Sequence, residues 1–211
     1  FFLINCYFPN DSGEHRNQFR NSFYYAIQLL CLDLIREHGK AVIVIGAINI
    51  AYHPLDHCEY ATAFKKEFPD DFDVGKQLIS SDDSKLITQF YTNPMRRWLA
   101  EWLYLRKCPD VEFEIEDHLL WRDCFRAMKP FKEFHDQYTC WNTLVSARGS
   151  NYGTRIDAIF TSGPLFAEES LVQLAECDIL PKVMGSDHCP VYCKLEFDEA
   201  MLEVNDEELQ R

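Results

Sequence analysis

The order of apolar segments near the start of the chain restricts its fold more than any other feature. Two apolar runs of strand length, Phe1 to Phe8 and Ala41 to Ile45, flank Arg16 to His38, where apolar residues recur at three- to four-residue spacing. Gly39 follows the last helical residue as a stop signal. Because the second run is continuously apolar, we expect a strand that is covered on both faces. Strand, helix and strand in this order predict a layered α/β fold.

The rest of the chain continues this pattern. Apolar spacing predicts a second helix over 94–107 and a short helix or turn over 117–125. Residues 56–84 are polar and irregular, which predicts a loop with short helical pieces. Since no repeat or internal linker interrupts the chain, we predict one domain over residues 1–197, followed by an acidic tail over 198–211. Runs of strand-forming residues predict four further strands, the last two of which complete the sheet: 138–141, 155–161, 179–183 and 191–197.

Composition narrows the classes of function. The nine cysteines are scattered and form no CxxC pair, which indicates free thiols in a reducing compartment and argues against a zinc site. The net charge of -13 argues against a simple electrostatic nucleic-acid binder, although the stretch from Lys129 to Arg155 is locally basic. The longest apolar run, Ala41 to Ile45, is too short to cross a bilayer, so no membrane partner is expected.

An acid and an imidazole stand side by side near the end of the chain. Asp187 and His188 follow a Gly-Ser turn and precede the apolar run Val191 to Leu195. A turn that ends where a strand begins can aim both side chains into one cleft. An aspartate can hold a hard divalent cation, and a histidine can bind or protonate a phosphoryl oxygen. An ordinary surface loop is the alternative interpretation of such a pair.

Two polar residues accompany predicted strands. Asn49 follows the buried strand at its carboxyl end, where ligands of layered α/β folds bind, and it suits either the positioning of a water or an Asx turn. Asp157 lies within an apolar strand, and burying a carboxylate without a partner is costly. Its partner is either His188, whose tautomer it would fix, or Arg155 in a salt bridge.

Four further residues are candidates for contacts at a cleft. Tyr7, at the end of the first strand, presents its phenol at the cleft edge or packs in the core. Trp141, Tyr152 and Arg155 suit stacking on or contact with a sugar-phosphate chain, but they suit the core or its rim equally well.

Together these phrases resemble the exonuclease III-like branch of the endonuclease/exonuclease/phosphatase superfamily, and most of all its eukaryotic AP endonuclease 2 subgroup. The resemblance implies a four-layer α/β sandwich, here incomplete at the N-terminus. The matching phrases follow one another along nearly the whole chain: Tyr7 to Asn10, Gly46 to Ala51, Pro54 to Asp56, Asp123 to Arg126, Tyr138 to Trp141, Asn151 to Asp157 and Gly185 to Val191.

The resemblance also implies an activity and a set of site residues. It implies Mg²⁺- or Mn²⁺-dependent hydrolysis of damaged double-stranded DNA in the nucleus, at abasic sites and at 3′ ends; no protein partner is indicated. The implied catalytic residues are Tyr7, Asn49, Asp157 and His188. The implied metal ligands are Asn49, Asp187 and His188. The implied DNA contacts are Trp141, Asn151, Tyr152 and Arg155.

One residue departs from the family pattern. The family writes Gly-Asp-x-Asn where this chain has Gly46-Ala47-Ile48-Asn49, so the carboxylate that would activate the attacking water is missing. Losing a catalytic base typically costs about two to four orders of magnitude in rate. The sequence therefore leaves two alternatives for the function: an impaired nuclease, or a catalytically inactive DNA-binding relative. A small-molecule phosphatase is less favoured, because such relatives usually lack the Tyr-x-Pro-Asn and Asn-x-Gly-x-Arg phrases.

Overall fold

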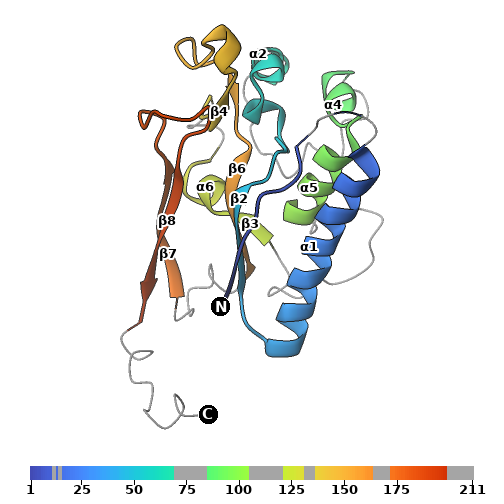
Figure 1. The fold of residues 1–211 in the computed structure, drawn as a ribbon, viewed down its shortest axis with the longest axis vertical. Coiled ribbons are helices and arrows are strands. Elements are labelled where there is room, and N and C mark those ends of the chain that lie inside the picture. Colours follow the sequence, from blue (N-terminus) through green and yellow to red (C-terminus); the bar gives the residue numbers. More distant parts are fainter. Residues whose placement is uncertain are drawn as a thin grey trace.

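The computed structural model describes residues 1–10, 13, 16–68, 85–104, 121–130, 136–163 and 172–198. Its centre is a four-stranded mixed sheet in the order β1-β2-β6-β3 (Figure 1). The strands are β1 (Phe2–Asn5), β2 (Val42–Ala47), β6 (Asp157–Ser162) and β3 (Trp121–Asp123).

The first half of the chain forms the strand–helix–strand unit that the sequence predicts. Strands β1 and β2 are parallel and are joined by α1 (Asn17–His38). Gly39 ends this helix in the left-handed conformation (φ 62°), and its N–H donates to the carbonyl of Ile35. Strand β6 then runs antiparallel to both β2 and β3.

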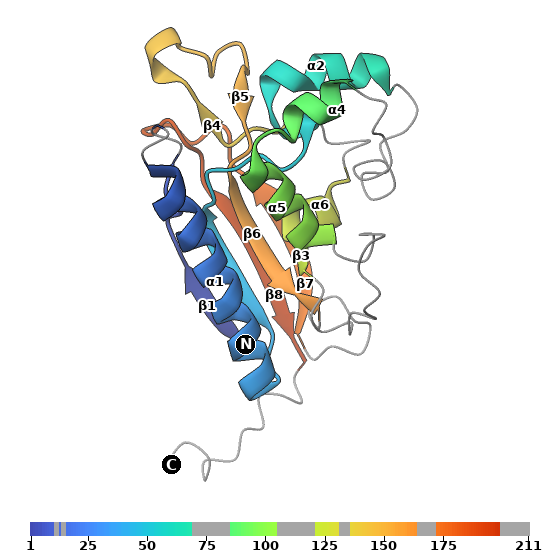
Figure 2. The same cartoon turned by 90° about the vertical axis from the view of Figure 1, so that its right-hand side faces the viewer.

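Different layers cover the two faces of the central sheet. Helices α1 and α5 (Pro94–Tyr104) cover one face (Figure 2). Behind the other face lies a separate antiparallel sheet of β7 (Val172–Ile179) and β8 (Val191–Phe197). Helix α6 (Cys124–Met128) contacts both β6 and β7 and so lies between the two sheets. This layered arrangement is the α/β class that the sequence predicts.

The remaining elements gather at one end of the sheet. Figure 1 shows them at the top of the view. They are η2 (Pro54–Asp56), α2 (Cys58–Glu67), α4 (Lys85–Phe90), β4 (Cys140–Trp141), η5 (Thr143–Val145) and β5 (Gly153–Thr154). None of the helices in the described part of the chain combines the length and the hydropathy that a membrane crossing requires.

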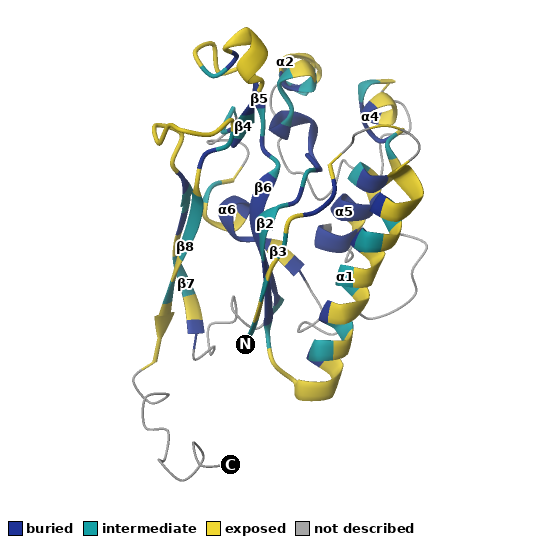
Figure 3. Ribbon diagram, in the orientation of Figure 1, coloured by how far each residue is buried: buried dark blue, intermediate teal, exposed yellow. Residues whose placement is uncertain are grey.

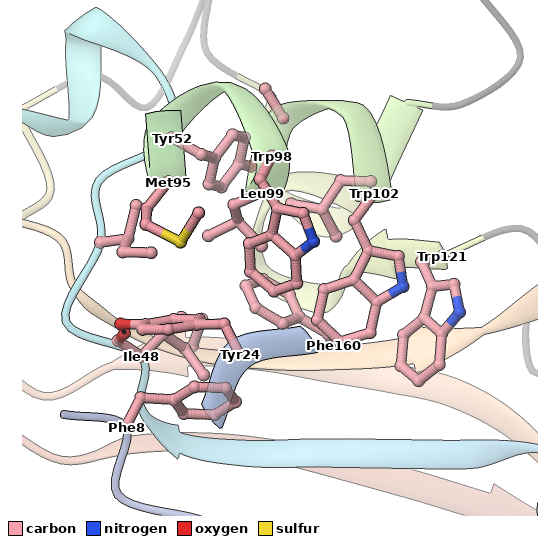
Figure 4. Packing of buried hydrophobic residues seen from close by; sticks show 14 of the residues in the cluster. Phe8, Tyr24, Ile48, Tyr52, Met95, Trp98, Leu99, Trp102, Trp121 and Phe160 are labelled. Carbon is pink, nitrogen blue, oxygen red and sulfur yellow. Dashed lines mark hydrogen bonds between the residues drawn. The ribbon is translucent and has the colours of Figure 1, made fainter. Parts of the chain in front are cut away.

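An aromatic cluster fills the space between the helices and the central sheet. The rings of Trp98, Trp102 and Trp121 follow one another at centroid distances of 5.1 and 4.8 Å (Figure 4). Tyr24 of α1 closes the cluster against Trp98. Figure 3 shows the matching burial pattern, with the exposed residues of α1 on the side away from the sheet.

A second core lies between the two sheets, and β2 contributes to both. Val42 and Val44 belong to the aromatic core, whereas Ile43 packs with Ile159 and Phe125 in the second core. Alternate residues of a strand point to opposite faces. The prediction that this strand is covered on both faces is therefore confirmed.

Three local predictions need correction or lie beyond the description. Residues 121–123 form a strand rather than a helix or turn, because Trp121 and Asp123 pair with Ser162 and Phe160 of β6. Strand β7 ends at Ile179 instead of covering 179–183, and it pairs with β8 in a sheet of its own. Residues 69–84 and 105–120, and the acidic tail after Asp198, lie outside the described residues.

Truncating the aromatic core tests its contribution. We expect Trp102→Ala to lower the free energy of unfolding by about 3–5 kcal/mol, because a large buried side chain leaves a cavity. Denaturant unfolding followed by far-UV circular dichroism measures the change. Leu144→Ala, at a side chain that is 93% exposed, is the matched control and is expected to shift stability by about 0.5 kcal/mol or less. Equal losses in the two variants would contradict this assignment of the core.

Candidate active site

An aspartate and a histidine meet at the end of the central sheet. Asp157 is the first residue of β6, and its Oδ2 and Oδ1 lie 2.8 and 3.0 Å from Nδ1 of His188. The hydrogen bond with Asp157, and after it one with Cys140, raises the pKa of His188 to about 10. Of the two partners that the sequence left open for Asp157, the structure therefore selects His188.

Backbone pairing brings the loop that carries His188 to this end of the sheet. The N–H of Trp141 donates to the carbonyl of Asp187 at 2.9 Å, and the N–H of Cys189 donates to the carbonyl of Thr139 at 2.7 Å. The buried hydroxyl of Thr139 accepts hydrogen bonds from the N–H groups of Ile156 and Asp157. One residue thus joins the strand that carries the acid to the loop that carries the imidazole.

Asn49 lies at the same end of the sheet. Its backbone has a left-handed φ of 59°, and its N–H donates to the carbonyl of Ile156, directly before Asp157. Its side-chain Nδ2 donates to the carbonyl of Phe8 at 2.7 Å. The side chain therefore makes a long-range contact with the segment after β1, which is not the local contact of an Asx turn.

The residue opposite Asp157 is Ala47. These two residues pair across β2 and β6, so a carboxylate at position 47 would lie beside that of Asp157. The residue before Ala47 must be glycine, because the segment that follows β1 packs closely against it. Gly46 has a φ of 139°, and an added Cβ would lie 2.1 Å from the carbonyl oxygen of Cys6. The methyl group of Ala47 supplies no proton acceptor at this position.

Tyr7 is on the surface at this end of the sheet. Its side chain is 66% exposed, and the next residue, Phe8, donates its N–H to the carbonyl of Ala47 at 2.9 Å. Of the two alternatives for Tyr7, packing in the core is therefore excluded.

Arg155 does not occupy the place expected of a DNA contact. Its guanidinium is buried and donates to Asp56 through Nε (2.8 Å) and Nη2 (3.0 Å), and to Asp123 at 2.6 Å. Arg126 donates to Asp56 as well, and Tyr52 donates to Asp123. The structure places the charge of Arg155 inside the protein, between both carboxylates, and contact of this residue with DNA stays a prediction.

The charges within this buried cluster stabilise one another. Burial opposes ionisation of Asp56, but the charges of Arg155 and Arg126 outweigh it and hold the pKa of the carboxyl at about 2. Burial likewise opposes the charge of Arg155, yet Asp123 and Asp56 raise the pKa of the guanidinium well above its ordinary value. The cluster thus consists of ion pairs rather than neutral groups.

The other expected DNA contacts divide between core and surface. Trp141 is buried, its Nε1 donates to Oδ1 of Asn151 at 3.1 Å, and the guanidinium of Arg148 covers its ring. The indole therefore packs in the core beneath Arg148, and its contact with a nucleic acid stays a prediction. Asn151 is exposed, although its side chain also donates to the carbonyl of Asp136 at 2.9 Å. Tyr152 is 52% exposed and presents a phenol at the surface.

The sequence does not single out two residues that support the site. Thr139 shows only the strand propensity of 138–141, and nothing in its neighbourhood signals that its hydroxyl joins β6 to the His188 loop. Arg148 belongs to the basic stretch from Lys129 to Arg155 and has no further signal in the sequence. Its guanidinium donates to three backbone carbonyls of that loop, those of Pro181, Val183 and Ser186.

The described residues offer only part of a site for Mg²⁺ or Mn²⁺. Among them, the acidic, thiol and imidazole groups whose ligand atoms lie within 4.8 Å of one another are Cys140, Asp187 and His188. Mg²⁺ demands oxygen ligands in octahedral geometry, and this set provides a single carboxylate. The set therefore does not fit a hard cation by itself, and ligation of Mg²⁺ by Asn49, Asp187 and His188 stays a prediction.

Comparison with known proteins places this arrangement in a class. No protein-family model matches the chain. The crystal structure of the Xenopus laevis APE2 catalytic domain matches with a TM-score of 0.62 and 29% identity, covering 93% of this chain and 50% of that one. The layered fold is thus that of the endonuclease/exonuclease/phosphatase type, as the sequence predicted.

The curated relatives specify the branch. DNA-(apurinic or apyrimidinic site) endonuclease 2 of Schizosaccharomyces pombe is 32% identical over 92% of this chain, and the human protein of that name is 29% identical over 90%. An exodeoxyribonuclease of Bacillus subtilis is 26% identical over 90% of the chain. These matches confirm the resemblance to the exonuclease III-like family and to AP endonuclease 2. The chain spans about a third of the length of the endonuclease 2 relatives, for example 30% of the Schizosaccharomyces pombe protein.

Removing Arg155 tests the buried cluster. We expect Arg155→Ala to cost about 3–5 kcal/mol in the free energy of unfolding, because it leaves the carboxylates of Asp56 and Asp123 buried without their main partner. Lys194→Ala removes an exposed ion pair with Glu196 and is expected to cost less than about 1 kcal/mol. Denaturant unfolding of both variants at neutral pH compares them; a small loss for Arg155→Ala would refute the structural role.

Neutralising Asp157 tests the acid–imidazole pair. We expect Asp157→Asn to lower the pKa of His188 from about 10 towards its ordinary value of 6.5. Because the folded-state pKa is raised, the pair contributes stability that is fully present below pH 6.5 and is lost as pH rises through about 10. NMR titration of the His188 imidazole resonances in the original chain and in Asp157→Asn measures the shift. An unchanged His188 titration would show that Asp157 does not control it.

Proposed function

We propose that this chain is the Asp–His-bearing part of a DNA-repair phosphodiesterase that cleaves DNA at abasic sites and trims 3′ ends in the nucleus. The observation that carries the proposal is the contact between Asp157 and His188 at the end of the β2–β6 pair, with Asn49 and Tyr7 at the same end. The names of the relatives support it, since they are endonucleases for apurinic or apyrimidinic sites and an exodeoxyribonuclease.

Each residue has a role that its position supports. His188, held in its charged form by Asp157, contacts a phosphoryl oxygen and meets the negative charge that develops there. Asn49 orients the attacking water, because its left-handed backbone turns it at the strand end. Tyr7 contacts the substrate beside the scissile phosphate through its exposed phenol. Asn151 and Tyr152 supply surface contacts to the DNA strand.

The catalytically inactive relative is the second candidate. The observation that favours it is the register of β2 and β6, which sets Ala47 directly opposite Asp157. A water at this position would meet a methyl group where the family pattern calls for a carboxylate. Such a protein would bind damaged duplex DNA through the same surface and leave the phosphodiester intact.

Restoring the carboxylate separates the two candidates. For the nuclease we expect Ala47→Asp to raise the rate of cleavage of abasic duplex DNA in Mg²⁺ at least about a hundredfold. Gel electrophoresis of end-labelled DNA measures cleavage, and a binding assay on the same DNA measures affinity. The control is Ala47→Asp combined with His188→Gln, which is expected to lose the gain. An unchanged rate together with tight binding would favour the inactive relative, and neither cleavage nor binding would refute both.

A further inference from the structure

We propose that Cys140, Asp187 and His188 form a binding site for a thiophilic divalent cation, namely Zn²⁺. The ligand atoms of these three residues lie within 4.8 Å of one another. The proposal does not depend on the proposed function, although the site shares His188 with it and shares Asp187 with the Mg²⁺ site that the family resemblance implies. The spacing of cysteines and histidines in the sequence argued against zinc, but that argument covers only ligands that are close in sequence.

Backbone pairing holds the thiol and the imidazole together. Cys140 and His188 form an antiparallel bridge. The two hydrogen bonds around it, from Trp141 to Asp187 and from Cys189 to Thr139, belong to the flanking residues, which makes Cys140 and His188 a non-hydrogen-bonded pair. In such pairs the Cα atoms approach to about 4.5 Å and the side chains lie closest. The thiol and the ring are therefore held side by side before any ion binds.

The carboxylate of Asp157 prepares the histidine as a ligand. It engages Nδ1 of His188 at 2.8 Å. A metal-ligating histidine almost always donates its other ring nitrogen to a carboxylate or carbonyl, which fixes the tautomer and increases the basicity of the ligating nitrogen. With Nδ1 engaged, Nε2 of His188 is the nitrogen that can face the ion beside Cys140, and binding of the ion displaces the proton that Nε2 carries in the charged imidazole. Cys140 and His188 are both half-buried.

The donor set selects the ion. A thiol, an imidazole and a carboxylate match the sulfur, nitrogen and oxygen ligands of zinc, at distances of about 2.0–2.3 Å. Tetrahedral coordination at those distances sets the ligand atoms roughly 3.3–3.8 Å apart. The ligand atoms now lie within 4.8 Å of one another, so small side-chain rotations bring them to the tetrahedral spacing. Asp187 is exposed and has room to rotate. Three protein ligands leave the fourth position open for water, as in catalytic zinc sites.

Cobalt titration tests the site without any nuclease assay. Co²⁺ added to the folded chain is expected to give thiolate-to-cobalt charge-transfer absorption, and Zn²⁺ is expected to displace it. Cys140→Ser is expected to abolish this absorption. Cys193→Ser, which removes another half-buried cysteine on β8, is expected to retain it. Circular dichroism of each variant confirms that the fold is kept.

Competition with Zn²⁺ extends the test to the carboxylate ligand. Asp187→Asn replaces this ligand by a neutral amide and is expected to weaken Zn²⁺ binding at least about tenfold. Absorption that survives Cys140→Ser, or a folded chain that shows none, overturns the proposal, as does an affinity that Asp187→Asn leaves unchanged. Since these measurements use the metal alone, absence of nuclease activity would leave the result intact.

Discussion

The buried guanidinium of Arg155 is the interaction on which the arrangement of the site depends. It links Asp56 of η2 to Asp123, the last residue of β3, and its own backbone N–H donates to the carbonyl of Asp56. Three segments distant in the sequence therefore converge on one cation, two residues before Asp157. Removing one partner of a buried ion pair leaves an uncompensated charge, so the three segments are held in a single relation. This relation sets where β6 begins and thus where Asp157 lies.

A second set of contacts fixes the position of the His188 loop relative to Asp157. Thr139 joins the start of β6 to this loop. The guanidinium of Arg148 lies over the ring of Trp141 and donates hydrogen bonds to backbone carbonyls of the loop. Gly153 allows the indole to lie against the backbone, because an added Cβ would come within 2.6 Å of the ring. Residues expected to touch DNA thus support the surface on which His188, Asn151 and Tyr152 are presented.

The site has a well-supported imidazole but lacks a carboxylate on the neighbouring strand. The imidazole is fully supported, whereas the opposing position carries Ala47 instead of a carboxylate. A site that lacks this oxygen and has Cys140 beside its histidine suits a thiophilic cation better than a hard one. Under the two proposals, the same histidine binds a phosphate in one state and a metal ion in another.

The sequence by itself determined the first strand–helix–strand unit and singled out Asp157 and His188 as separate candidates. The spacing of apolar residues in 16–38 and the unbroken run 41–45 predict α1 and β2, since each segment's local pattern matches the period of its structure. It also named Asp157, because a carboxylate inside an apolar strand requires a partner. Only the tertiary structure decided which partner this is. Local patterns carry no information on contacts between distant segments, so they could not assign His188 to Asp157, bury Arg155 between Asp56 and Asp123, or bring Cys140 beside His188.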